Sequence, residues 1–223
     1  MKPSLVTVVV PAFNESATIR RVIEDLMSVT KSIIVVDDGS GDKTAEVAEN
    51  AGAIVLRHII NRGLGASLQT GFKKALELRA DFVITFDADR QHNAKDILPM
   101  LAMLKSGYVD AVIGARDFSK NAPILRKIYN SFADILGYFF FGVYVKDTQS
   151  GLRGFRSDIL KKFQTLGDRM EISSEIIGEL YRLKARVKTI PIESIYTNYS
   201  LSKGQSLKTG IKTFLSLILH KFK

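Results

Sequence analysis

The chain has 223 residues, of which 46% are hydrophobic and 25% charged, as expected for a globular protein with a sizeable core. Because it contains no cysteine, disulfides and thiolate metal sites are excluded, and with three histidines any metal ion is expected on oxygen ligands. The net charge of +9 favours an anionic partner: a phosphorylated substrate, lipid headgroups or nucleic acid.

Strand and helix signals alternate along the first half of the chain. Continuous apolar runs predict buried strands at 5–10, 32–36, 53–56, 82–86 and 111–113. Helical spacing of apolar residues predicts helices between these strands, one capped by Ser16, one at 43–50 capped by Asp42, one at 63–79 and one after Asn93. This alternation is typical of a parallel α/β sheet with helices on both faces.

The second half is less regular. Its patterns predict helices at 123–141 and 171–184, strands at 144–145 and 187–192, and a final helix from about residue 206. No linker, repeat, signal peptide or apolar run of about 18 residues interrupts the pattern, so we expect one domain without a membrane span.

Acidic side chains follow three of the predicted strands: Glu15, the pair Asp37 and Asp38, and the pair Asp87 and Asp89. In open α/β sheets, ligands bind beyond the carboxyl ends of the strands. Residues i and i+2 of an extended chain point to the same side, so the last pair is able to face one ligand. Two carboxylates suit Mg²⁺ or Mn²⁺ bound to substrate phosphates. The alternative reading of each acid is a solvated loop residue.

The usual phosphate-binding loops are missing. The sequence 63–65, Gly-Leu-Gly, opens a helix but lacks the third glycine of the dinucleotide fingerprint, and there is no P-loop. A metal ion held by acids is therefore the remaining device for binding a phosphorylated ligand.

Successive motifs resemble those of family 2 glycosyltransferases with the GT-A fold. They are PAFNE (11–15), VVDDGSGDKT (35–44), NRGLGASLQTG (61–71), DADRQH (87–92), GAR (114–116), DTQSGLRGFR (147–156) and VKTIPI (187–192). The match covers nearly the whole chain and is nearest to polyprenyl-phosphate glycosyltransferases of the dolichyl-phosphate mannose synthase type. Polysaccharide synthases of the family usually add a QxxRW motif, and this chain has no tryptophan.

The resemblance implies a mostly parallel central sheet with helices on both faces, within a single domain over 1–223. A Rossmann-like nucleotide-sugar half would span about 1–115, an acceptor half about 116–205, and a basic amphipathic tail helix about 206–223.

The resemblance also implies roles for the strand-end residues on the donor side. Pro11, Glu15 and Asp38 would hold the base and ribose, with Asp37 alongside; Asp87 would approach the ribose or metal, and Asp89 and Gln91 would ligate Mg²⁺ or Mn²⁺ at the diphosphate. Arg90 stands where the family often has an apolar residue.

On the acceptor side, Arg116 and Arg126 match basic positions of the family, and Lys203 loosely matches a tail motif in which arginine is commoner. A lipid monophosphate, with a second pKa near ~6, is already mostly dianionic and needs no protein base. A hydroxyl acceptor would need one, and Glu171 or Glu175 lies near the family's position for it. The alternative reading of both glutamates is an exposed helix face.

The predicted function is metal-dependent, inverting transfer of a hexose from a nucleotide diphosphate sugar to a polyprenyl or dolichyl phosphate. GDP-mannose is favoured over UDP-glucose because the motif set resembles mannose synthases. The alternatives are transfer to a sugar hydroxyl, and a non-catalytic basic binder of anionic lipid or nucleic acid. No aromatic-interleaved basic motif supports nucleic acid as a partner.

The basic tail predicts contact with a membrane surface. After Glu193 the chain has five lysines and no acid, beside an apolar face formed by Ile211, Phe214, Leu215, Ile218 and Leu219. The alternative reading of this face is burial against the sheet. We therefore expect a cytoplasmic protein, peripheral on the cytoplasmic face of the membrane.

Overall fold

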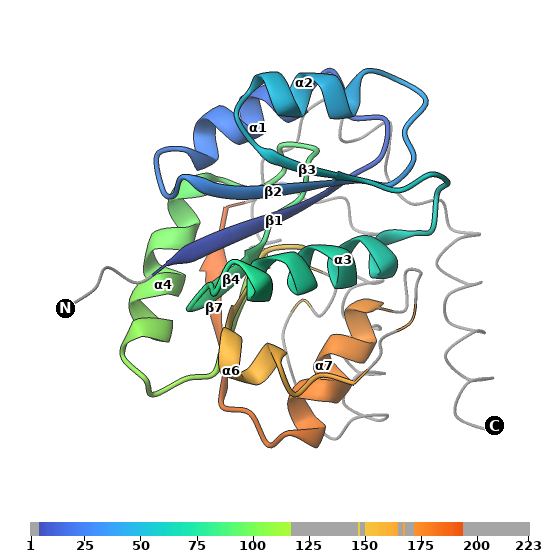
Figure 1. Ribbon diagram of the computed structural model, residues 1–223. Helices are drawn as coiled ribbons and strands as arrows, with labels where there is room; N and C mark the ends of the chain where they lie inside the picture. The colour runs from blue at the N-terminus through green and yellow to red at the C-terminus, as the bar shows by residue number, and fades with distance from the viewer. Residues whose placement is uncertain (1–4, 117–146, 148–149, 165–166, 168–171, 194–223) are drawn as a thin grey trace, which may run out of the picture.

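The computed structural model describes residues 5–116, 147, 150–164, 167 and 172–193, and its centre is a seven-stranded sheet (Figure 1). The strands in chain order are β1 (Val6–Ala12), β2 (Ser32–Asp37), β3 (Ile54–Arg57), β4 (Phe82–Thr85), β5 (Ala111–Arg116), β6 (Arg153–Arg156) and β7 (Val187–Ile192). Their spatial order is β3-β2-β1-β4-β6-β5-β7. Only β6 runs antiparallel to its neighbours within this sheet, so the predicted mostly parallel α/β fold is confirmed.

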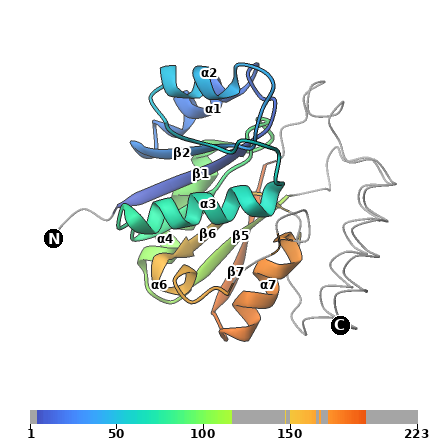
Figure 2. The same cartoon turned by 45° about the vertical axis from the view of Figure 1, so that its right-hand side comes forward.

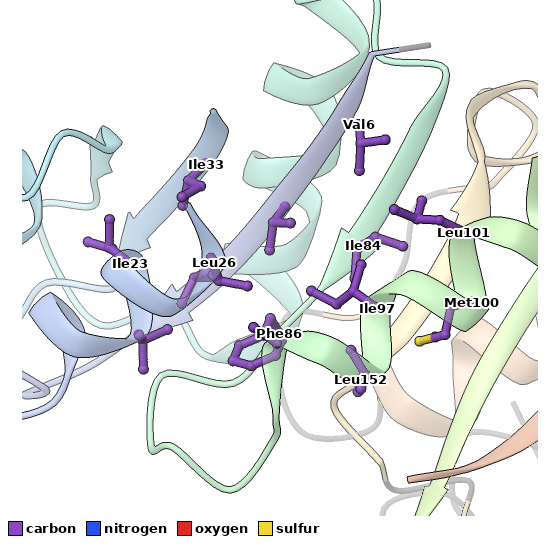
Figure 3. Close-up of a cluster of buried hydrophobic side chains, with 14 of the residues drawn as sticks. Val6, Ile23, Leu26, Ile33, Ile84, Phe86, Ile97, Met100, Leu101 and Leu152 are labelled. Atoms are coloured by element: carbon purple, nitrogen blue, oxygen red, sulfur yellow. The ribbon is translucent and has the colours of Figure 1, made fainter. Parts of the chain in front are cut away.

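Helices cover both faces of the sheet. One face carries α1 (Ile19–Leu26), α2 (Thr44–Asn50), the 3-10 turn η1 (Ala94–Asp96) and α4 (Ile97–Lys105); the other carries α3 (Leu64–Glu77), α6 (Ser157–Leu160) and α7 (Ile172–Arg182) (Figure 2). Alternate residues of β1 supply both cores: Val8 packs under α1 and α4, whereas Val9 packs under α3. In Figure 3 the first core brings Leu26, Ile84 and Ile97 together, with Phe86 beside them at the end of β4.

One local prediction needs correction, and two short elements were not predicted. Ser16 does not cap the first helix: α1 begins at Ile19, because residues 15–18 form a turn in which the Thr18 amide donates to the Glu15 carbonyl at 3.0 Å. The Ser16 amide instead donates to Asp42 at 3.2 Å. Strand β6 and helix α6 were not predicted, because four residues with two arginines carry no strand signal.

The predicted helix at 123–141, the strand at 144–145 and the tail helix lie outside the described residues. Across the ranges that the structure describes, every helix is too short or too polar to cross a bilayer.

Gly71 allows α3 to approach β1 closely. A Cβ atom at this position would lie less than 3.0 Å from Cγ1 of Val9, a fully buried and rotationally stiff side chain. We expect Gly71→Ala to lower the free energy of unfolding by about 1–3 kcal/mol, despite the higher helix propensity of alanine. Urea unfolding measures this, with Gly41→Ala as control because a Cβ there meets nothing within 4 Å. Equal stability of the two variants would contradict the expectation, and Val9→Ala should relieve the cost.

Candidate active site

The site lies at the edge of the sheet where the parallel strands end. β1 leads through α1 to β2 and β3 on one side, whereas β4 lies on its other side, so a topological switch point separates β1 from β4. Because β6 is antiparallel, its beginning lies at this same edge, and residues 150–152 reach the carboxyl ends of β4 and β5. The sheet thus brings the predicted donor motifs and the 147–156 motif to one edge.

Glu15 and Asp37 are fixed by loops that follow β1 and β2. The Glu15 carboxylate accepts a hydrogen bond from the Thr18 hydroxyl at 2.8 Å, and its amide donates to the Thr44 hydroxyl at 2.8 Å. Asp37 is buried, accepts from the Ser40 amide at 3.0 Å and pairs with Arg57 at 3.2 Å. Pro11 stands in register with Val36 between these two loops.

The Asp38 carboxylate holds the loop that leads into α3. It accepts hydrogen bonds from the amides of Arg62 at 3.0 Å and Gly63 at 2.7 Å, and from Nδ1 of His58 at 2.7 Å. Nε2 of His58 in turn lies 2.9 Å from the hydroxyl of Thr70 on α3. Since a carboxylate only accepts, Nδ1 of His58 carries a proton, and in the neutral tautomer Nε2 accepts from the hydroxyl. Asp38 therefore shapes the edge of the site through the backbone of this loop.

The segment after β4 turns back on itself at Arg90, whose φ of 65° is in the left-handed region. Beyond this turn, Gln91 donates to Asp89 through its amide at 3.0 Å and again through its side chain. Nε2 of the buried His92 lies 3.0 Å from the carboxylate of Asp87. The turn accounts for the left-handed backbone of Arg90. Among the described residues, nothing accounts for an arginine side chain at this position.

The two carboxylates of this turn have opposite pKa shifts. Burial and the nearby charge of Asp87 raise the pKa of Asp89 above its ordinary value, against the hydrogen bonds from Gln91. Burial also acts to raise the pKa of Asp87, but the hydrogen bond and charge of His92, together with Arg116 and Arg153, outweigh it. The net effect lowers the pKa of Asp87 below its ordinary value. The ionised form of Asp87 is thus favoured in the fold, whereas that of Asp89 is disfavoured.

Gly151 lies directly against Asp87. A Cβ atom on this glycine would come within 3.0 Å of both carboxylate oxygens of Asp87. Its carbonyl accepts a hydrogen bond from the Thr85 hydroxyl at 2.6 Å, which ties the loop before β6 to the end of β4. The absence of a side chain at residue 151 is therefore what allows Asp87 its position.

Arg116, at the end of β5, forms a two-pronged ion pair with Asp147. Nε and one terminal nitrogen of the guanidinium each lie 2.7 Å from a carboxylate oxygen, and the Arg116 amide donates to the same carboxylate at 3.0 Å. Asp147 is buried and Arg116 nearly so, with side-chain exposures of 0% and 14%. The predicted acceptor cation is therefore already oriented by a buried carboxylate.

The remaining predicted residues fall outside this group. Arg126, Lys203 and Glu171 lie outside the described residues. Glu175 accepts a hydrogen bond from the Gly167 amide, which favours its reading as a residue that holds a loop rather than as a base. Four partners of the site were missed in the sequence: His58, His92, Asp147 and the contact of Gly151. Of these, His92, Asp147 and Gly151 stand inside the family motifs at 87–92 and 147–156, whereas His58 stands outside any motif.

Within the described ranges, no group of three or more histidine, aspartate and glutamate side chains is arranged to hold a metal ion. The donor set of Asp87, Asp89 and the amide of Gln91 nevertheless suits Mg²⁺ or Mn²⁺, which typically use one or two protein carboxylates and take further oxygens from a substrate diphosphate. A divalent cation at this place would stabilise the ionised form of Asp89, which burial and the charge of Asp87 disfavour.

A mostly parallel sheet with acidic residues gathered at its switch point is the architecture of the GT-A glycosyltransferases. The family model described as "Glycosyl transferase family 2" matches residues 7–164, and the chain belongs to this family. It is a glycosyltransferase.

Two relatives and one solved structure are similar to this chain. The chain is 44% identical to an uncharacterized protein of Methanocaldococcus jannaschii, over 96% of this chain and 91% of that protein. It is 33% identical to the UDP-N-acetylglucosamine--dolichyl-phosphate N-acetylglucosaminyltransferase of Methanococcus voltae, over 99% and 98% of the two chains. Glucosyl-3-phosphoglycerate synthase from Mycobacterium tuberculosis, solved with Mn²⁺, UDP and phosphoglyceric acid, shares the fold with a TM-score of 0.73 at 20% identity, over 96% of this chain and 78% of that one.

Proposed function

We propose that this chain transfers a sugar from a nucleoside diphosphate sugar to a polyprenyl phosphate, with inversion at the anomeric carbon and with bound Mg²⁺ or Mn²⁺. The observation that carries the proposal is one sheet edge holding the acids of a donor site, Asp87 and Asp89, beside an oriented guanidinium, Arg116. The name of the Methanococcus voltae relative supports both the lipid phosphate and a nucleotide sugar donor.

The same relative changes the order of the candidate donors. UDP-N-acetylglucosamine becomes the first donor to test because it stands in the name of a relative that matches almost the whole chain. GDP-mannose, which the motifs favoured, and UDP-glucose follow. We place Pro11, Glu15, Asp37 and Asp38 around the nucleoside in each case.

On the donor side, Asp89, Gln91 and Asp87 would hold the cation. The cation would neutralise charge that develops on the departing diphosphate. Asp87 would be held in place by His92 and by the backbone at Gly151, whereas Gln91 would orient Asp89. These residues would fix the diphosphate so that the anomeric carbon faces the acceptor side.

On the acceptor side, Arg116 would bind the lipid phosphate, together with Arg126 and Lys203. A phosphate monoester is already a dianion near neutral pH, so its oxygen attacks the anomeric carbon without a general base. What the protein supplies is a fixed cation, and Asp147 orients the guanidinium fork of Arg116 for that task. Because this acceptor is a lipid, we place the protein at a membrane surface, on the cytoplasmic face, with the basic tail as a contact.

Transfer is tested with the purified full chain, a polyprenyl phosphate, Mn²⁺ or Mg²⁺ and the three nucleotide sugars in parallel. We expect a sugar-linked polyprenyl phosphate from one donor, and no product after chelation. Transfer that is insensitive to chelation would contradict the metal. Product from a sugar hydroxyl acceptor but not from polyprenyl phosphate would contradict the acceptor.

His92 is expected to support donor binding through Asp87. Its Nδ1 atom is buried with no hydrogen-bond partner within the described residues, so its one polar contact there is the hydrogen bond to Asp87. His92→Leu removes the hydrogen bond to Asp87. We therefore expect the affinity for UDP with Mn²⁺ to fall about 10-fold or more, as for other residues that orient metal ligands. His92→Gln keeps an N–H and should retain most of the affinity. Calorimetric titration compares the two, and an unchanged affinity in His92→Leu would contradict this role.

A further inference from the structure

Arg153 is a buried arginine between the donor and acceptor sides of the site. It begins β6, is 2% exposed, and stands in register with Thr85 of β4 and Ile113 of β5. The first of these strands leads to Asp87 and the second ends at Arg116. A guanidinium in the middle of a sheet is costly to bury unless carboxylates compensate its charge.

Two carboxylates supply that compensation, one from each side. Burial lowers the pKa of Arg153 to about 10, whereas the charges of Asp87 and Asp147 act to raise it and that of Arg116 acts to lower it. In return, Arg153 contributes to the lowered pKa of Asp87. The four side chains therefore form one charge cluster, Asp87–Arg153–Asp147–Arg116. The charge of Asp87 interacts with both guanidinium groups, whereas Asp147 interacts with Arg153 and forms the ion pair with Arg116.

We propose that Arg153 is a positioning residue that couples occupancy of the donor side to occupancy of the acceptor side, through the carboxylates of Asp87 and Asp147. This inference rests on the function proposed above. A ligand that draws the charge of Asp87 toward the donor side strengthens the attraction between Arg153 and Asp147. The hold of Asp147 on Arg116 then weakens, and more of the guanidinium's charge is available to an acceptor phosphate.

Thermodynamic linkage makes this coupling reciprocal. If donor-side ligands tighten acceptor binding by some factor, the acceptor must tighten donor-side binding by the same factor. Couplings of this kind typically amount to about 5-fold or more, which is well within the precision of titration calorimetry.

The experiment measures the affinity of the full chain for farnesyl phosphate, with and without saturating nucleoside diphosphate and Mn²⁺, and then the reverse order. UDP and GDP are used in parallel. For the wild type we expect about 5-fold tighter binding of farnesyl phosphate in the presence of the nucleotide, and the same factor in reverse. Arg153→Met removes the charge at similar length, and its factor should fall to about 1. Arg153→Lys keeps a charge without the fork, and its factor should lie between the two.

Arg156→Met is the matched control. This arginine stands on the same strand, points to the opposite face and pairs with Asp158 at 3.1 Å, so its variant should keep the wild-type factor. Thermal unfolding of each variant shows whether it folds, and Arg153→Lys carries the test if Arg153→Met does not. A wild-type factor retained in a folded Arg153→Met or Arg153→Lys overturns the inference. So does a wild type that binds both ligands independently. A wild type that binds neither ligand refutes the proposed function itself.

Discussion

Asp89→Asn is expected to abolish sugar transfer while making the protein more stable. Burial and the charge of Asp87 disfavour the ionised form of this carboxylate, and in the proposed function it holds the cation at the diphosphate. Asparagine keeps the shape but loses the charge, so transition-state stabilisation worth several kcal/mol disappears. We expect the rate of transfer to fall about 1,000-fold or more.

The gain in stability follows from the direction of the pKa shift. Burial and the charge of Asp87 raise the pKa of Asp89 above its ordinary value of 3.8, so the folded protein binds the proton more tightly than the unfolded chain. Ionised Asp89 therefore destabilises the fold above its raised pKa, and this cost disappears as pH falls below the ordinary value. Asparagine removes this cost, and its side-chain oxygen still accepts from the backbone amide of Gln91. The side-chain amide of Gln91 can flip so that its oxygen faces the new NH₂ group.

Thermal unfolding from neutral to acidic pH tests this second part. The melting temperature of Asp89→Asn should exceed that of the wild type at pH 7, and the difference should shrink toward pH 4. Asp96→Asn is a useful comparison, because burial also raises the pKa of Asp96, which is not assigned to the site. That variant should gain stability and keep activity. A destabilised Asp89→Asn, or one that retains transfer, would contradict the place given to this carboxylate.

The acids of the candidate site were predictable because they lie at or a few residues beyond the end of an apolar strand signal. Once β1, β2 and β4 are placed in a parallel sheet, their carboxyl ends share one edge, and the loops that carry Glu15, Asp37 and Asp87 follow at that edge. The contacts that hold these acids were not predictable in the same way. His58 reaches Asp38 from the end of the next strand, and no periodicity marks a histidine as the partner of an aspartate 20 residues away.

The surroundings of Arg116 could not be predicted from sequence patterns. Arg116 was predicted as a cation for phosphate, but its buried partner Asp147 lies 31 residues further along the chain. The pairing depends on β6, a short antiparallel strand that inserts between β4 and β5 and carries two arginines. Because tertiary packing outweighs intrinsic propensity in so short a strand, neither the strand nor the charge cluster around Arg153 is visible in the pattern.

Gly151→Ala is expected to lower both the rate of transfer and the stability of the protein, because of the single Cβ atom that it adds. The backbone of Gly151 is outside the left-handed region, and the three atoms nearest to a Cβ at this position all belong to the carboxyl group of Asp87. The new Cβ must displace a carboxylate that His92 holds at 3.0 Å, or push away the loop that Thr85 ties to β4. We expect a loss of about 1–3 kcal/mol in stability. A displaced Asp87 should lower the rate of transfer about 100-fold.

A double-mutant cycle isolates that contact. In an Asp87→Ala background the two carboxylate oxygens are gone, and Gly151→Ala should then change the free energy of unfolding far less than it does in the wild type. Gly41→Ala, whose Cβ meets nothing, serves as the control for the general effect of adding alanine in a loop. If Gly151→Ala cost the same with and without the Asp87 carboxylate, the glycine would be needed for the loop alone. A large interaction energy would instead mean that the loop before β6 fits closely around Asp87, so that the position of this carboxylate depends on that loop as well as on β4.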